Sequence, residues 1–321
     1  MEKTSNAKKF FKSKTFTLIL LLAVIVAFFA IATKGAFLKP LNIRNILNSM
    51  VLVSLLAIGE GLLIIAGNID LSAGSVGTLC GVLLAYSLNT MGLPWPIAVI
   101  LMLVVGAICG GINAALINEL GFQPFIATLA MSSVCEGLTY VICGALAIPV
   151  KDPVITFIGT GKIATYIPVS IIISLLLLII YGIVLSKTKF GRTIYLCGGN
   201  RNAARLAGLN PKKLSYILFM NCGALAALSG GLLAARLKSG TTQGIKTLQF
   251  SGVTAAILGG ISFGGGSGGM LGCFIGLLII NGFNNGMTVM GIDPYWQQVA
   301  SGLLLILALL FDFFSATSAI K

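Results

Sequence analysis

Histidine is absent from the 321 residues, and only eight residues are Asp or Glu. Histidine is the commonest metal ligand and the side chain that most readily exchanges protons near neutral pH. A chain without histidine and with so few carboxylates has little from which to build a hydrolytic or metal-dependent active site. This shortage makes an enzyme the least favoured class of function, and we predict that the chain is not one.

Charge is also scarce, because 9% of the residues are charged whereas 57% are hydrophobic. An average soluble domain is about 25% charged, so this chain cannot cover a water-facing surface, and disorder requires low hydrophobicity. Its apolar runs are continuous and have the length that a helix needs to cross a bilayer. A transmembrane barrel would instead show shorter, alternating segments. The composition therefore predicts an all-α, polytopic membrane protein.

Sequence motifs for cofactors are missing as well. The seven cysteines form no Cys-x-x-Cys pattern, and we expect them to be small buried residues rather than disulfides or metal ligands. Gly161 and Lys162 are followed by Ile163, so the phosphate-binding pattern G-x-x-x-x-G-K-[ST] fails. We expect no cofactor on this chain, and energy from ATP would have to come from another chain.

Ten apolar segments are predicted to cross the membrane, which places both chain ends on one side. They are Phe16–Ala32, Ile46–Ala66, Ala73–Leu88, Trp95–Ile117, Pro124–Cys143, Tyr166–Ser186, Leu214–Ala235, Gln249–Gly260, Gly269–Val289 and Tyr295–Phe311. The first could be a secretory signal, but we favour an uncleaved span because its apolar run is long. The predicted domains are a basic cytoplasmic tail (1–15), one transmembrane domain (16–312) and a second cytoplasmic tail (313–321).

Basic residues set the predicted orientation. Lys and Arg collect in cytoplasmic loops, and segment 187–213 carries seven of them without an acidic residue. With this segment inside, both termini are cytoplasmic. The net charge of +13 then records topology, and no nucleic-acid partner is expected.

Segment 187–213 also contains a predicted short helix. Asn200 is a suitable N-cap and Gly208 a suitable residue just after the helix end. Such a basic helix either lies on anionic lipid or docks a cytoplasmic partner, and we favour docking.

An internal repeat links two glycine-rich segments. Shifted by 192 residues, Ile65–Ser75 faces Ile257–Ser267, with identities at Ile65, Gly67, Ile69, Gly74 and Ser75. Transporters often carry such repeats, with interrupted helices near the substrate path. We predict a duplication with broken helices near 67–75 and 259–267. The span count makes the repeat parallel, and one miscounted span would make it inverted.

Polar residues inside or beside the spans are the candidate functional residues. An acid at membrane depth is costly and must face protein, water or a partner. We expect Glu60 and Glu136 to bond backbone N–H or hydroxyl groups rather than relay protons, and Asp70 and Ser72 to cap the helix that starts near Ala73. The predicted substrate-pathway residues are Glu60, Asn68, Asp70, Ser72, Ser75, Ser262, Ser267, Asn281, Asn284 and Asn285. For the three asparagines, interhelical hydrogen bonds are the alternative to a wet path.

Several segments together carry a family resemblance. They are Gly67–Ser75, Pro124–Leu129, Gly191–Arg192, Gly198–Gly208, Leu258–Ser262 and Pro294–Gln298. In this combination and order they resemble the permease subunits of bacterial ABC importers for simple sugars of the ribose, xylose and arabinose type. Asn68 and Ala73 replace a usual glycine and valine of the family pattern. Glu136 replaces an expected basic residue, where an acid would alter substrate choice or pair with a neighbouring chain.

The resemblance implies a permease that moves a simple sugar or similar small polar solute into the cytoplasm by alternating access. It implies a bacterial cytoplasmic (inner) membrane and three kinds of partner. These are a second permease in a homo- or heterodimer, a cytoplasmic ABC ATPase that binds ATP and magnesium, and an extracytoplasmic solute-binding protein. The ATPase is expected to dock at Arg192, Asn200, Arg201, Ala203, Ala204, Arg205 and Gly208.

A self-contained ion-coupled secondary transporter is the alternative. It would use Glu60, Glu136 or Asp70 and would take up solute without a second chain. The basic segment 187–213 has no explanation in that alternative.

Overall fold

A computed structural model of the protein describes residues 14–163 and 167–318. Within them the chain is largely helical, which confirms the all-α class. The helices are α2 (Lys14–Ala32), α3 (Pro40–Ile65), α4 (Ala73–Asn89), α5 (Trp95–Asn118), α6 (Pro124–Cys143), α7 (Pro153–Thr160), α8 (Val169–Lys187), α9 (Lys189–Gly199), α10 (Arg201–Leu206), α11 (Pro211–Leu237), α12 (Gln249–Leu258), α13 (Met270–Val289) and α14 (Pro294–Ser318).

Short elements connect the helices. They are the 3-10 helices η1 (Ala36–Leu38) and η2 (Lys246–Leu248), and the two-residue strands β1 (Ile148–Pro149), β2 (Lys162–Ile163), β3 (Ile167–Pro168) and β4 (Ser239–Gly240). Strand β1 pairs antiparallel with β4, and β2 pairs antiparallel with β3. Proline opens α3, α6, α7 and α11, because its missing N–H leaves no hydrogen bond unmade at the first helical position.

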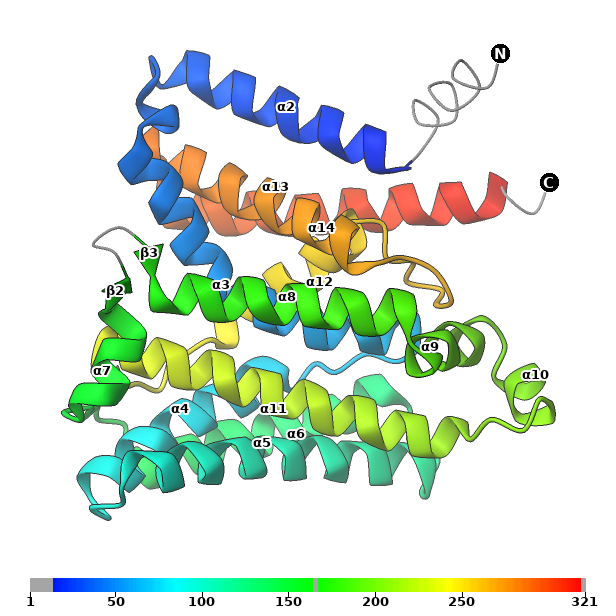
Figure 1. The fold of residues 1–321 in the computed structure, drawn as a ribbon, viewed down its shortest axis with the longest axis horizontal. Coiled ribbons are helices and arrows are strands. Elements are labelled where there is room, and N and C mark those ends of the chain that lie inside the picture. The colour runs from blue at the N-terminus through cyan, green and yellow to red at the C-terminus, as the bar shows by residue number, and fades with distance from the viewer. Residues whose placement is uncertain (1–13, 164–166, 319–321) are drawn as a thin grey trace.

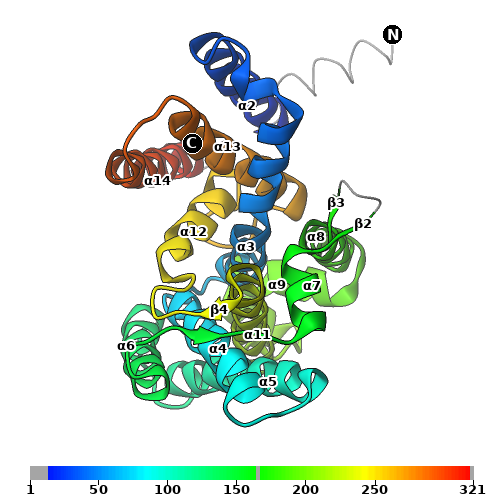
Figure 2. The same ribbon diagram turned by 90° about the vertical axis from the view of Figure 1, so that its left-hand side faces the viewer.

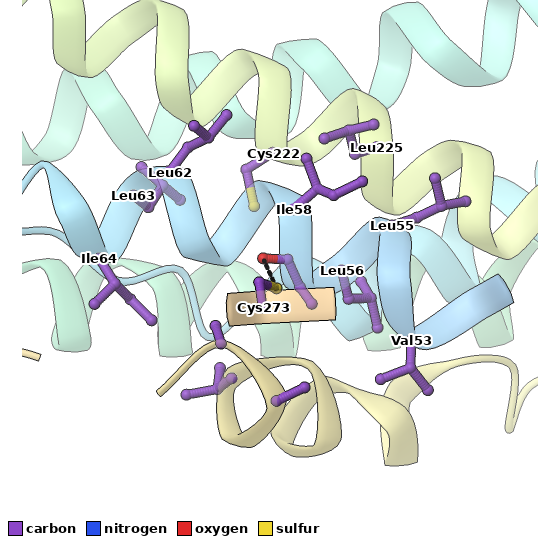
Figure 3. Packing of buried hydrophobic residues seen from close by; sticks show 14 of the residues in the cluster. Val53, Leu55, Leu56, Ile58, Leu62, Leu63, Ile64, Cys222, Leu225 and Cys273 are labelled. Carbon is purple, nitrogen blue, oxygen red and sulfur yellow. Dashed lines mark hydrogen bonds between the residues drawn. The ribbon is translucent and has the colours of Figure 1, made fainter. Parts of the chain in front are cut away.

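Helix α3 is the centre of the bundle. From Met50 to Ile65 it is apolar apart from Ser54 and Glu60, and 89% of its most hydrophobic stretch is buried inside the protein, as expected for a helix that is hydrophobic nearly all round. Figure 2, which looks along most of the helices, shows α3 between α12 and α13 on one side and α8 and α11 on the other. In Figure 3, Ile58 and Leu62 of α3 lie near Cys222 of α11. The Cys273 thiol of α13 contacts the carbonyl oxygen of Ala57 at 3.9 Å.

Glycines let α11 approach its neighbours closely. A Cβ on Gly230 would overlap the carbonyl oxygen of Gly77 on α4, and a Cβ on Gly223 would overlap that of Gly106 on α5. Small residues at such contacts bring helix backbones together, which is how helices associate where no hydrophobic driving force exists between them. The Gly-rich patterns around residues 77 and 106 therefore serve packing.

Seven of the described helices are long and apolar enough to cross a membrane, namely α2, α3, α5, α6, α8, α11 and α13. The predicted count of ten spans is not confirmed. Two apolar stretches, Ala73–Asn89 and Pro294–Leu310, are shorter than the seven and fall below the roughly 20 residues that a helix needs to cross a bilayer, and α12 has only ten residues. Each of the ten predicted spans nevertheless overlaps a helix.

The ends of the predicted spans differ from the observed helices in places. Helix α8 starts at Val169, and Tyr166, the predicted start of that span, lies outside the described residues. Helix α14 continues to Ser318, past the predicted end at Phe311. Residues 1–13 of the predicted basic tail also lie outside the described part of the chain.

Helix α2 packs on the bundle as a span does. The Phe29 ring is buried beside Gly286 of α13, where a Cβ would overlap it. Phe29 also stacks on Phe37 with ring centroids 5.5 Å apart.

The bundle has two distinct ends. Helices α9 and α10 lie at one end of the long axis, with the start of α2 and the end of α14 (Figure 1). Helix α7 and strands β2 and β3 lie at the other end (Figure 1), and Figure 2, which faces this end, also shows β4, the partner of β1.

Candidate functional site

Residues 66–72 separate α3 from α4, so the predicted first break is present. Within it, Asp70 Oδ1 accepts hydrogen bonds from the Ser72 N–H at 2.8 Å and the Ser72 hydroxyl at 2.5 Å. The Asp70 carboxylate therefore bonds Ser72 and not the first N–H groups inside α4. Ser72 is the N-cap of α4, but its side chain makes no cap hydrogen bond. The prediction that Asp70 and Ser72 cap α4 is therefore wrong.

The residue that caps α4 comes from the other half of the chain. Gln249, the first residue of α12, accepts a hydrogen bond from the Gly74 N–H through Oε1 at 3.0 Å. Its amide Nε2 donates to the Asp70 carbonyl oxygen at 3.3 Å. One amide side chain thus satisfies a donor at the helix start and an acceptor in the break, which are groups that are costly to leave unpaired in a core.

Two further polar side chains complete a buried cluster at the first break. Glu60 Oε2 accepts from the Asp70 N–H at 3.3 Å, which confirms the predicted bond between Glu60 and backbone. Asn113 of α5 donates to the Ser72 hydroxyl at 2.9 Å. Glu60 Oε1 and Asn113 Oδ1 have no hydrogen-bond partner among the described residues. The cluster joins α3, α5 and α12 at the break.

Asn113 and Gln249 were missed in the choice of candidate residues. Asn113 lies inside the apolar α5, whose other asparagine, Asn118, is at the helix end; a polar residue at membrane depth is the signal that would have found Asn113. Gln249 has no comparable signal, because its partners lie 175 and 179 residues away.

The second break, residues 259–269, is also present between α12 and α13. Ser262 and Ser267 lie in it, and the Ser262 N–H donates to the Ser267 carbonyl oxygen at 3.2 Å. Asp312 Oδ2 accepts from the Phe263 N–H at 2.9 Å and from the Ser262 hydroxyl at 3.2 Å. A mostly apolar hollow of about 470 Å³ lies here between the break and α14.

The three asparagines of α13 are not part of either break. Asn285 accepts from the Asn42 amide of α3 at 2.8 Å, and Asn284 accepts from the Ser301 hydroxyl of α14 at 3.1 Å. Asn281 donates to a carbonyl of its own helix. Two of these residues thus make helix–helix contacts, and their side chains make no hydrogen bond to Glu60, Asp70, Ser72 or Ser75 among the described residues. The Asn68 side chain donates to the Ala66 carbonyl oxygen at 3.5 Å, and the Asn68 N–H donates to the Leu63 carbonyl oxygen of α3 at 2.9 Å.

The two breaks meet each other and helix α9. The Gly266 N–H donates to the Ile65 carbonyl oxygen at 2.8 Å. Gly198 of α9 packs on both, because a Cβ there would overlap the Ile65 oxygen and lie 2.8 Å from the Gly266 nitrogen. The Tyr195 hydroxyl of α9 donates to the Gly268 carbonyl oxygen at 2.7 Å. We refer to this contact of Ile65, Tyr195, Gly198, Gly266 and Gly268 as the glycine junction.

The hydrogen bond from the Tyr195 hydroxyl to Gly268 in the glycine junction persists at any physiological pH. Burial raises the pKa of the Tyr195 hydroxyl above its usual value, so the hydroxyl remains protonated and remains a donor.

Helix α10 has the predicted ends. The Asn200 side chain accepts from the Asn202 and Ala203 N–H groups at 3.1 and 2.9 Å, and Gly208 has a positive φ of 80°. Both the N-cap and the glycine after the helix are thus confirmed.

Six of the seven predicted docking residues are exposed to solvent, and one is buried. Arg192, Asn200, Arg201, Ala203, Arg205 and Gly208 are exposed, whereas Ala204 is buried and serves packing. Leu206 is 90% exposed at the tip of α10, so an apolar side chain projects beside the arginines.

Glu136 forms an ion pair within the chain. Its carboxylate lies 2.6 Å from the Lys246 ammonium of η2, so the prediction that it bonds a backbone N–H or hydroxyl group is wrong. Beside it on α6, Ser132 shares a hydrogen bond with Ser75 of α4, with the two hydroxyl oxygens 2.7 Å apart. Polar groups of α6, α4 and η2 therefore gather next to the first break.

Known proteins similar to this chain are transport permeases. A family model described as the permease component of a branched-chain amino acid transport system matches residues 42–309. The chain is 35% identical to the ribose import permease protein RbsC of Bacillus subtilis over 279 residues, which cover 86% of each chain. It is 33% identical to the D-allose transport system permease protein AlsC of Escherichia coli, covering 91% of this chain and 89% of the relative. No solved structure matches the chain.

The match to a further relative covers nearly the whole length of both chains. The xylose transport system permease protein XylH of Haemophilus influenzae is 30% identical, and the match covers 93% of this chain and 96% of that protein.

Proposed function

The chain belongs to the family of ABC importer permeases matched over residues 42–309, and we propose that it imports a simple sugar by alternating access. It is a transport subunit of an ATP-driven sugar importer and not an enzyme, with ATP hydrolysis on a separate chain. The relatives support this function over a self-contained ion-coupled transporter. The proposed solute is a pentose or hexose, because the relatives are named for ribose, xylose and D-allose.

Family membership implies an ATPase and a solute-binding protein as partners. The ATPase docks on α9 and α10, where exposed arginines and the exposed Leu206 offer charge and apolar surface together. The solute-binding protein docks at the opposite end, on α7 and the strand pairs. A second permease, identical or related, completes the pathway.

The orientation has the α9–α10 end in the cytoplasm. Segment 187–213 carries seven basic residues and no acid, which favours the inner side of the membrane. The start of α2 and the end of α14 lie at the same end (Figure 1), in keeping with two cytoplasmic termini. Ten membrane-embedded segments result if α4, α12 and α14 join the seven long spans.

The observation that carries the mechanism is the glycine junction. Helix α9 contacts both breaks through backbone, so a movement of α9 cannot leave the breaks unchanged. ATP binding moves the ATPases, α9 follows, and the glycine junction passes this movement to the breaks. The first break then moves Asp70, Ser72 and Ser75, and the second moves Ser262 and Ser267, which are our proposed pathway residues with Glu60 and Asn68. Asn281, Asn284 and Asn285 contribute from α13.

Uptake by reconstituted vesicles tests this function. The permease is reconstituted with its ATPase and binding protein, and radiolabelled D-ribose, D-xylose, D-allose and D-fructose are offered in turn. We expect uptake of at least one sugar that needs ATP and all the chains. Uptake by this chain alone under a proton or sodium gradient, without ATP, would contradict the proposal.

A further inference from the structure

The ion pair of Glu136 and Lys246 lies on the outer surface of the single chain. Both side chains remain partly exposed, with 39% of the Glu136 side chain and 43% of the Lys246 side chain accessible. Lys246 lies in η2, which directly precedes α12, and Figure 2 shows α6 and α12 on the same flank of the bundle.

This ion pair lies at membrane depth. Helix α6 has 20 residues, and Glu136 precedes its end at Cys143 by roughly 10 Å at the usual rise of an α-helix. The backbone of Lys246 lies beside the start of α4, because its Cα would be 3.0 Å from a Cβ on Gly74, and its ammonium group lies 2.6 Å from the Glu136 carboxylate. Neither charge can therefore reach the end of the bundle by a simple change of rotamer.

A charged group at this depth does not face lipid. Insertion of Lys, Arg or Asp at the centre of a membrane helix costs about 2.5–3.5 kcal/mol, and such residues face protein or water-filled cavities. Helix α6 has an apolar surface for lipid at other positions, since Val134 and Leu138 are also exposed. The surface with Glu136 continues instead to the hydroxyl pair of Ser132 and Ser75.

We propose that Glu136 and Lys246 line a water-filled part of the solute pathway, on the flank that faces the second permease, and contact the solute there. This inference rests on the proposed function and adds a site to it. The ligand is a neutral, polyhydroxylated solute. The pair has no net charge, and it offers carboxylate acceptors and ammonium donors side by side, as the hydroxyl groups of a sugar require. A charged solute would have to separate the two groups.

Cysteine labelling distinguishes water from lipid at this site. The variants are Glu136→Cys and, as the matched control, Leu138→Cys, which lies two residues along α6 and is 46% exposed. The native cysteines are all buried, so the unmodified protein gives the background. The probe is the anionic, water-soluble reagent sulfonatoethyl methanethiosulfonate, which the remaining Lys246 attracts.

The labelling is done on the complete transporter in vesicles, with and without ATP. We expect the Glu136→Cys protein to react at least tenfold faster than the Leu138→Cys protein in one of the two conditions. Equal, background rates in both conditions would overturn the inference, because residue 136 would then face lipid or dry protein.

Charge reversal tests contact with the solute independently. We expect Glu136→Lys and Lys246→Glu each to lower sugar uptake about tenfold or more, with the ATPase still bound, and the double variant to regain a large part of it. The control Glu119→Gln removes the exposed ion pair with Lys212 on the cytoplasmic side and reports what loss of such a pair does to thermal stability.

A failed inference is distinguishable from a failed function. If the unmodified protein shows no ATP-dependent uptake, the proposed function fails. If the unmodified protein transports sugar but both reversals transport equally well, only the site at Glu136 and Lys246 fails.

Discussion

The glycine junction predicts opposite results for two neighbouring glycines of α9. A Cβ on Gly198 would overlap the Ile65 carbonyl oxygen and stand 2.8 Å from the Gly266 nitrogen, whereas a Cβ on Gly199 would meet nothing within 4 Å. The Gly266 contact alone is about 0.6 Å short of ordinary van der Waals distance. The atoms in the way are backbone atoms, which cannot rotate aside as a side chain does.

The Gly198→Ala protein must therefore separate α9 from the breaks. Overpacking of this kind costs typically about 1–3 kcal/mol, and we expect it to shift the resting arrangement of the glycine junction rather than unfold the bundle. Gly199→Ala has the same chemistry and gains up to about 1 kcal/mol of helix propensity, so it is the matched control.

The assay compares ATP-driven sugar uptake with ATP hydrolysis in the same vesicles. We expect Gly198→Ala to lower the sugar transported per ATP at least tenfold while the ATPase remains bound, and Gly199→Ala to leave this ratio within twofold of the unmodified protein. Equal ratios for the two variants would refute the reasoning, because the contact of α9 with the breaks would then carry no movement.

Two further predictions concern side chains that form hydrogen bonds with the backbone of the breaks and of the adjoining helix start. Tyr195→Phe removes the hydrogen bond to the Gly268 carbonyl, which is worth about 0.5–1.5 kcal/mol. We expect this protein to assemble normally and to transport less sugar per ATP hydrolysed. An unchanged ratio of sugar uptake to ATP hydrolysis would argue that the hydroxyl only stabilises the fold. Gln249→Ala leaves the Gly74 N–H and the Asp70 carbonyl unpaired, and each unpaired group costs about 1–3 kcal/mol of folding free energy. We expect a lower midpoint of thermal unfolding in detergent. An unchanged midpoint would contradict the capping role.

Much of the local structure was predictable because its causes lie within a few residues of each other. The cluster of Gly, Asn, Asp and Ser at 67–72 predicted the first break, and Ala73 is the observed start of α4. The N-cap at Asn200 and the glycine at 208 depend only on neighbouring N–H groups, and both are confirmed.

The contacts of the candidate site were not predictable because they join distant parts of the chain. Gln249 caps a helix 175 residues away, and no local pattern distinguishes it from other glutamines. Glu136 was expected to bond locally or to pair with a neighbouring chain, whereas Lys246 of the same chain binds it. The asparagines of α13 were expected to form interhelical hydrogen bonds or to line a wet path, and two of them do bond α3 and α14. Their partners, Asn42 and Ser301, could not be read from the sequence.

The contact of α9 with both breaks could not be predicted either. The repeat brought Gly67 and Gly259 into register, but it is Gly266 that bonds Ile65. The breaks meet because the close packing of glycine backbones allows it, and that packing is a property of the folded bundle.

An ATPase that docks on α9 and α10 is expected to drive this permease. Co-purification shows directly whether the ATPase binds there. The tagged protein is purified in mild detergent with its co-expressed ATPase, as the unmodified chain and with Arg201→Glu and Arg205→Glu together. The matched control carries Lys151→Glu and Lys162→Glu, the same change of charge on exposed residues near the opposite end. We expect the unmodified and control proteins to retain the ATPase and the arginine variant to lose it. An unmodified protein that purifies without the ATPase, or an arginine variant that keeps it, would show that the ATPase does not dock on α9 and α10.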